Sequence, residues 1–114
     1  MSYNKYKNVK VKIDGFKFDS IAESVRYTEL KLLVKAGLIN NLILQPRFEL
    51  QSKFRHNGKA EIAICYVADF SYTDQAEEKI IVEDVKGMET DVFKIKRKMF
   101  LKLYGETHEL RIIR

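Results

Sequence analysis

Acidic and basic side chains gather at the ends of two predicted strands in the middle of the 114-residue chain. Side chains of a strand alternate between faces, so Asp84 and Lys86 project together from one strand while Glu83 points to the opposite face. If the two strands pair as a hairpin, Asp69 of the preceding strand meets Asp84 at the same end of the sheet. Two buried carboxylates need a neutralising cation. Hard divalent cations favour oxygen ligands, so the pattern predicts a Mg²⁺ or Mn²⁺ site. The alternative is an ordinary exposed ion pair between Asp84 and Lys86.

Glu23 is the third acidic candidate. Its position on the predicted helix falls on one stripe with Tyr27 and Leu30, so its carboxylate points partly toward apolar neighbours. Glu23 is also the fourth residue of a capping box that begins at Ser20, and a bond back to the start of the helix would explain it. Two roles therefore stay open for Glu23, in a metal site or in helix capping alone.

Turn and cap signals indicate the elements that must position these residues. The Asp14-Gly15 turn between alternating apolar residues predicts a small hairpin. The capping box at Ser20 begins a helix that is predicted to run to Ala36. The other predicted segments are an irregular strand at 42–50, a polar loop at 52–59, strands at 61–72 and 79–86 joined by an acidic loop, a helix at 92–104 and a strand at 108–113. This order of hairpin, α, β, β, β, α, β predicts an α/β fold.

Length and charge bound the function further. A chain of 114 residues suffices for one domain, so residues 1–114 are expected to form a single unit with a frayed segment at 1–8. Lys and Arg number 21 against 16 Asp and Glu, which gives a net charge of +5. This balance favours polyanionic partners.

Cysteine usage and hydropathy indicate the cellular compartment. Cys65 is the only cysteine, lies in an apolar run and is expected to be a core residue in a reducing, intracellular environment. The N-terminus lacks the apolar stretch of a signal peptide, and no segment reaches the roughly 20 apolar residues of a membrane helix. Two histidines and one cysteine are too few for a structural zinc site.

The order of the acidic residues resembles that of the PD-(D/E)xK nuclease superfamily: Glu23 in a helix, Asp69 in a strand, and Asp84-x-Lys86 in the next strand. More closely, the chain is similar to a family of small phage and prophage proteins that resemble Holliday-junction resolvases. The segments that carry this closer resemblance are 16–20 with Glu23, 44–48, 66–70 and 82–87.

The resemblance extends from about residue 10 to the end of the chain, with two departures. Ala68 stands in place of the proline that names the motif, and Asp84 stands where the superfamily often has Glu. Neither departure removes a carboxylate, so the acidic set is complete.

The resemblance implies a restriction-endonuclease-like core, with a central mixed β-sheet flanked by two helices. It implies an Mg²⁺- or Mn²⁺-dependent DNA endonuclease, selective for branched DNA, that acts in phage recombination or replication in the cytoplasm of a bacterial host. The implied metal ligands are Asp69, Asp84, the Val85 carbonyl and Glu23, and Lys86 would orient the attacking water or stabilise the phosphate.

Partners follow from the same resemblance. Symmetric cleavage of a junction needs two active sites, so a homodimer is expected. The chain has no Gly-rich phosphate loop and is not expected to use a nucleotide cofactor. The alternative function is a non-catalytic DNA-binding or replication-accessory module that retains the nuclease fold.

Basic residues indicate where DNA would lie. The helix at 92–104 is expected to bury a stripe made of Val92, Ile95, Met99 and Leu103. The residues predicted to contact DNA phosphates are Lys94, Arg97, Lys98 and Lys102 on this helix, and Lys10 and Lys12 near the N-terminus. A merely solvated face is the alternative for both groups. For the loop that contains His56, solvent exposure is preferred over a DNA contact.

Overall fold

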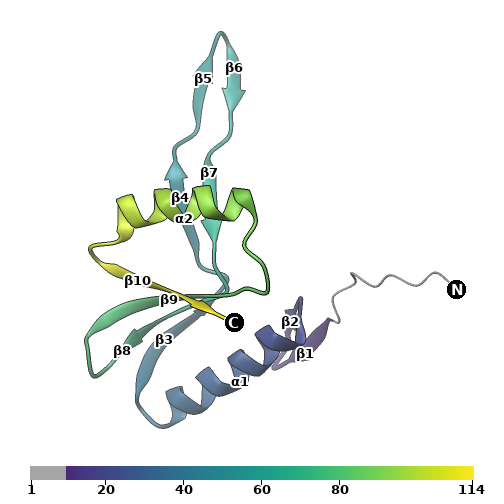
Figure 1. The fold of residues 1–114 in the computed structure, drawn as a ribbon, viewed down its shortest axis with the longest axis vertical. Helices are drawn as coiled ribbons and strands as arrows, with labels where there is room; N and C mark the ends of the chain where they lie inside the picture. The colour runs from purple at the N-terminus through teal and green to yellow at the C-terminus, as the bar shows by residue number, and fades with distance from the viewer. Residues whose placement is uncertain (1–9) are drawn as a thin grey trace, which may run out of the picture.

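The computed structural model describes residues 10–114, so the predicted frayed segment at 1–8 lies outside the described residues. The elements in chain order are β1 (Val11–Ile13), β2 (Phe16–Phe18), α1 (Ile21–Lys35), β3 (Ile39–Leu44), β4 (Arg47–Gln51), β5 (Phe54–His56), β6 (Lys59–Glu61), β7 (Ile64–Val67), β8 (Phe70–Asp74), β9 (Lys79–Val85), α2 (Asp91–Tyr104) and β10 (His108–Ile113). Figure 1 shows their arrangement.

A four-stranded mixed sheet lies at the centre of the fold. Its strand order is β10-β9-β8-β3, in which β10 runs parallel to β9 and the other neighbours are antiparallel. The predicted hairpin of the two central strands is confirmed by the pairing of β8 with β9. The α/β class with a mixed sheet and two helices is therefore confirmed.

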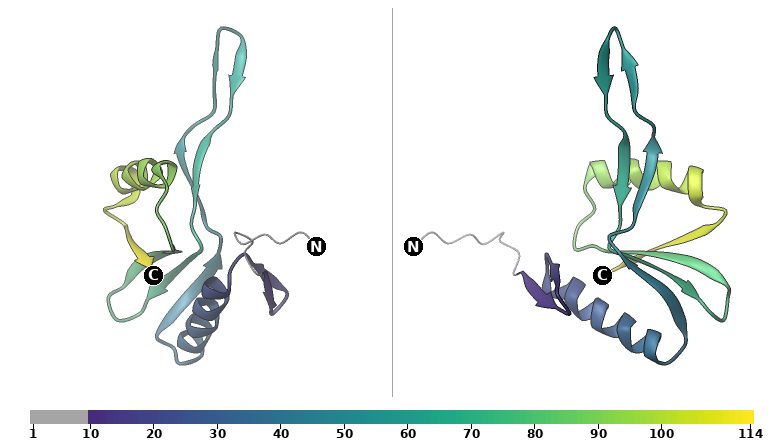
Figure 2. Two further views of the ribbon diagram at one scale, coloured as in Figure 1. Left: turned by 45° about the vertical axis from the view of Figure 1, so that its right-hand side comes forward. Right: turned by 180° about the vertical axis from the view of Figure 1, so that it is seen from behind.

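The two helices cover opposite faces of this sheet. Ile81 and Val82 are neighbours on β9 and are both fully buried, so their side chains point to opposite faces. Ile81 packs in one apolar cluster with Leu30 of α1, and Val82 packs in another with Phe100 of α2. Figure 2 shows α1 and α2 on the two sides of the strands.

The N-terminal turn and the first cap form as predicted. Asp14 and Gly15 both have positive φ, at 53° and 83°, which is the backbone of a tight hairpin turn. Ser20 caps α1 by accepting a hydrogen bond from the Glu23 amide at 3.1 Å. The helix ends at Lys35, one residue earlier than predicted.

Residues 47–67 leave the sheet as a long two-stranded hairpin, hereafter the arm (Figures 1 and 2). The irregular strand predicted at 42–50 is divided at Gln45 and Pro46 into β3 and β4, of which β3 is an edge strand of the four-stranded sheet. Gln45 has a φ of 52°, and proline has no amide hydrogen for a sheet ladder. The strand predicted at 61–72 is divided as well, into β6, β7 and β8.

The predicted polar loop at 52–59 is wrong, because β5 and β6 pair across an Asn57-Gly58 turn. Both turn residues have positive φ, at 51° and 76°, as a tight hairpin requires. The base of the arm packs against α2, where Leu50 and Tyr66 are buried.

The second helix forms as predicted but buries a different face. Thr90 caps α2 by accepting a hydrogen bond from the Phe93 amide at 3.1 Å. The expected buried stripe is wrong for Val92, Ile95 and Leu103, which are 62%, 60% and 56% exposed, while its fourth member, Met99, is partly buried against the core. Phe93 and Phe100 are buried instead, because aromatic rings remove more apolar surface from water. Neither helix in residues 10–114 is long and apolar enough to cross a bilayer.

Candidate functional site

Asp69 lies at the junction between β7 and β8, where the backbone holds it on three sides. Its amide donates to the Glu83 carbonyl at 3.0 Å, and its own carbonyl accepts from the Gln45 amide at 2.9 Å. The Asp69 Oδ2 atom accepts a hydrogen bond from the Val85 amide at 2.7 Å. The carboxylate is thus fixed against the end of β9, and the predicted meeting of Asp69 with that end is confirmed.

Asp84 is buried beside it, with 3% of its surface exposed. The Tyr66 hydroxyl donates to Asp84 Oδ2 at 2.5 Å, and Lys86 Nζ lies 3.5 Å from Asp84 Oδ1. Lys86 Nζ also lies 4.5 Å from the centre of the Phe93 ring, in a cation–π contact. The pairing of Asp84 with Lys86 is confirmed, but the acid is buried, so the exposed surface pair that was the alternative is wrong.

The environment of Asp69 disfavours its charge. Burial raises the pKa of Asp69 to about 7, and the negative charges of Asp84 and Glu23 act in the same direction. The hydrogen bond from the Val85 amide opposes this rise in pKa. Asp69 and Asp84 therefore form an acidic pair, hereafter so called, in which a negative charge on one carboxylate disfavours a negative charge on the other. Binding of a proton or a cation relieves this repulsion.

Glu23 approaches this pair from α1. It lines a small pocket of about 80 Å³ together with Asp69 and Gln45. Burial raises the pKa of Glu23, the charge of Asp19 adds to the rise, and the Asp19 amide partly offsets it. Because the Glu23 amide makes the cap at Ser20, capping leaves the Glu23 carboxylate available to this pocket.

The acids form a pair rather than a complete triad. Among residues 10–114 no three Asp, Glu, His or Cys side chains come together as a group that could hold a metal ion. Val85 adds an oxygen on the same side, since the amide and carbonyl of one strand residue point toward the same neighbour and the Val85 amide points to Asp69.

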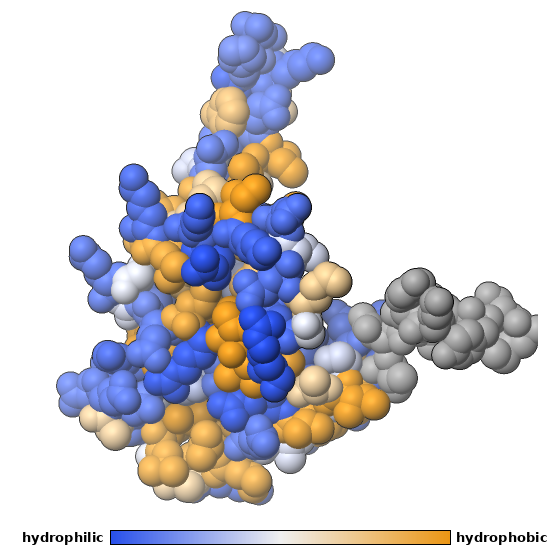
Figure 3. Space-filling model, in the orientation of Figure 1, coloured by the Kyte–Doolittle hydropathy of each residue, from blue (hydrophilic) through white to orange (hydrophobic). Residues whose placement is uncertain are grey.

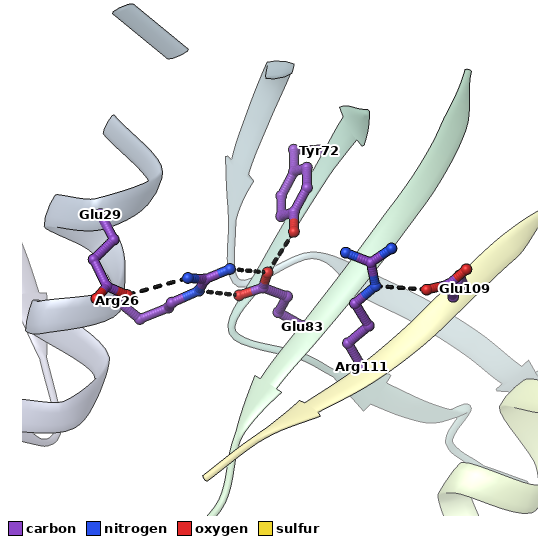
Figure 4. A network of polar contacts seen from close by, with 6 residues as sticks. All are labelled: Arg26, Glu29, Tyr72, Glu83, Glu109 and Arg111. Atoms are coloured by element: carbon purple, nitrogen blue, oxygen red, sulfur yellow. Dashed lines mark hydrogen bonds and ion pairs between the residues drawn. The ribbon is translucent and has the colours of Figure 1, made fainter. Parts of the chain in front are cut away.

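Sequence reasoning placed Glu83 on the opposite face but missed its partner (Figure 4). Glu83 is fully buried and accepts from Arg26 Nε at 2.7 Å and from Arg26 Nη2 at 2.6 Å. The Tyr72 hydroxyl donates to the same carboxylate, and burial together with this contact raises the pKa of Tyr72 to about 12. Arg26 lies three residues after Glu23 on α1, a spacing that places both on neighbouring parts of one face.

The predicted DNA-contacting residues lie on two separate surfaces. Lys94, Lys98 and Lys102 are exposed on α2, and they form no ion pair within the described part of the chain. Arg97 on the same helix is partly buried. Lys10 and Lys12 are exposed on the α1 side, where Lys10 lies 4.0 Å from Asp19.

The fold and site define a class of α/β protein in which a mixed sheet ends in an acidic pair, one acid buried and the other half-buried, beside a lysine. The chain belongs to the family described as "Protein of unknown function (DUF1064)", whose profile matches residues 3–114. Searches of curated proteins and of solved structures found no significant match.

Proposed function

We propose that this protein is a divalent-metal-dependent DNA endonuclease built on a restriction-endonuclease-like core, as the resemblance to the PD-(D/E)xK superfamily implies. The observation that carries the proposal is the pair formed by half-buried Asp69 and buried Asp84, with the Lys86 ammonium 3.5 Å from Asp84. A structural ion pair between Asp84 and Lys86 does not need a second, half-buried acid beside it, whose charge raises the free energy of the folded state.

The donor atoms suit a hard cation. Asp69, Asp84 and the Val85 carbonyl offer oxygens on one side of the sheet end, and Glu23 adds a carboxylate from the shared pocket. Bound Mg²⁺ or Mn²⁺ would lower the pKa of a water molecule and stabilise the charge that develops on a phosphate. Its arrival would also relieve the repulsion between the two aspartates.

The other residues of the site hold these groups in place. Tyr66 fixes Asp84 through its hydroxyl, and the Val85 amide fixes Asp69. Phe93 supports the Lys86 ammonium from one side, which leaves this cation poised to orient a water molecule or contact a phosphate oxygen.

DNA would be held by the exposed lysines of α2, which contact phosphates without reading base sequence. Binding of this kind suits an enzyme that selects branched DNA by shape, as in phage recombination or replication. Cleavage of both strands at a symmetric junction needs two sites, so the active form is proposed to be a homodimer.

The test is cleavage of labelled four-way junction, linear duplex and single-stranded DNA in Mg²⁺, Mn²⁺ or EDTA. We expect metal-dependent cleavage that Asp69→Asn and Asp84→Asn each abolish. Glu106→Gln is the matched control, because Glu106 is exposed and forms no ion pair within the described residues. Intact DNA under all metal conditions would refute the proposal.

A DNA-binding module without cleavage is the second candidate. It is favoured by the observation that only two of the expected acids form a close pair among residues 10–114. Salt-sensitive binding of the same DNA molecules, without cleavage in either metal, would support this candidate.

A further inference from the structure

The arm extends far beyond the folded body of the protein. All twelve residues from 51 to 62 are exposed, and Leu50 is the last buried residue before the tip. An isolated two-stranded hairpin has little stability of its own in water. We therefore expect the exposed part of the arm to be stabilised by contact with another molecule. Figure 3 shows a largely hydrophilic surface over its tip.

The tip, residues 53–59, is strongly basic. Lys53, Arg55 and Lys59 are exposed, and no acidic residue occurs between positions 53 and 59. None of these three cations forms an ion pair within residues 10–114. Arg55 instead donates to the Gly58 carbonyl at 2.6 Å, which fastens its side chain to the turn.

The shape and the charge of the tip together select one partner. A two-stranded ribbon fits the major groove of double-stranded DNA, which is about 12 Å wide. Cations without carboxylate partners gain most from phosphates, because each neutralised phosphate releases condensed counterions.

The reach of the arm gives the spacing between the two contacts. Ala68, beside the acidic pair, is ten positions after Gly58 at the turn, which corresponds to about 33 Å at about 3.3 Å per residue. One turn of a DNA duplex is about 34–36 Å long. Phosphates one turn apart face the same side of the duplex, so one straight duplex can meet both the tip and the sheet end.

We propose that the tip of the arm binds the phosphate backbone of double-stranded DNA about one helical turn away from the acidic pair. This inference rests on the proposed function, to which it adds a second contact with the same DNA. The tip positions the duplex and takes no part in the chemical step.

The test compares two double variants that each remove two positive charges. Lys53→Gln/Lys59→Gln changes the tip and leaves Arg55 in the turn. Lys31→Gln/Lys35→Gln changes two lysines of α1 that form no ion pair in the described residues, at the far end of the molecule from the tip (Figure 1). Affinity for a 30-base-pair duplex is measured by fluorescence anisotropy in EDTA at several salt concentrations.

We expect the tip variant to bind about tenfold more weakly at low salt and to reduce the slope of log affinity against log salt by about 1.8, at about 0.9 per lost phosphate contact. The α1 variant keeps the slope of the original chain. Shortening the duplex to about eight base pairs, which is less than one turn, prevents both contacts from forming at once and should weaken binding of the original chain more than binding of the tip variant.

Equal losses in the two double variants, or no loss in either, would overturn the inference. Equal weakening of the two proteins by the shorter duplex would overturn the spacing of one helical turn. Because binding is measured without metal, a chain that binds through its tip but never cleaves DNA would refute the proposed function and leave this inference standing.

Discussion

Arg26 on α1 and Glu83 on β9 form a two-point ion pair whose acid has no exposed surface. The planar guanidinium matches the carboxylate with two parallel hydrogen bonds, which fixes distance and orientation together. This ion pair connects α1 to the central strand β9 at Glu83, the residue directly before Asp84. It therefore sets how closely Glu23, one turn earlier on α1, approaches the acidic pair.

Removal of the guanidinium should destabilise the fold. Arg26→Met is expected to lower the free energy of unfolding by about 3–5 kcal/mol, since it leaves the Glu83 charge buried with only the Tyr72 hydroxyl as a partner. Urea denaturation measures the change. Glu29→Gln, which removes the exposed partner of Arg26, should cost less than about 1 kcal/mol. The double variant Arg26→Met/Glu83→Leu should be more stable than Arg26→Met, and equal stability of the two would contradict this account.

The stability of the metal-free protein should depend on pH through Asp69. Its folded pKa of about 7 lies above the unfolded value of about 3.9, so the folded chain binds this proton more tightly. The resulting stability is complete below about pH 4 and is lost as the pH rises through about 7. The free energy of unfolding in EDTA should therefore fall across this range.

Asp69→Asn provides the control for this pH dependence, because asparagine does not titrate. The variant should show a flatter profile than the original chain between about pH 4 and 7. A profile with the same slope in both proteins would show that another group is responsible. Mg²⁺ should stabilise the original chain more at pH 8 than at pH 5, where protons compete for the acidic pair.

Lys86 should matter for the chemical step rather than for binding. Lys86→Met is expected to reduce the single-turnover cleavage rate about 100-fold or more, while DNA affinity in EDTA changes less than about threefold. Lys86→Arg should not restore the rate, because the planar guanidinium differs in shape from the ammonium beside Phe93. Equal losses of rate and affinity in Lys86→Met would assign the lysine to DNA binding alone.

The proposed homodimer is checked by sedimentation equilibrium at several protein concentrations. We expect the mass of two chains, because symmetric cleavage of a junction needs two active sites. The mass of one chain, both alone and with a four-way junction present, would contradict the dimer and favour cleavage of one strand at a time.

Local signals predicted much of this fold. Asp14-Gly15, the Ser20 cap and the Thr90 cap act over a few residues, so their effect can be read directly from the sequence. The meeting of Asp69 with the end of β9 followed from strand alternation and hairpin pairing. The strand at 108–113 was also predicted with its observed bounds.

Features that depend on competition between distant parts of the chain could not be predicted in this way. On α2 two apolar stripes occur at helical spacing, and packing against both the sheet and the base of the arm decides that Phe93 and Phe100 are buried rather than Val92 and Ile95. The hairpin at the tip was missed although Asn57-Gly58 is a strong turn signal, because its flanking residues are polar and lack the alternation of a buried strand.

Two backbone hydrogen bonds, here called the bracket, hold the base of the arm beside the acidic pair. Gln45 donates to the Asp69 carbonyl at 2.9 Å, and Ala68 donates to the Pro46 carbonyl at 3.1 Å, so both ends of segment 47–67 are fixed at one level of the sheet. Insertions or deletions in the exposed part of the arm, residues 51–62, should leave the register of β3, β8 and β9 unchanged, as exposed hairpin tips generally tolerate. In evolutionary terms, the exposed part of the arm is therefore free to change in length without displacing Asp69.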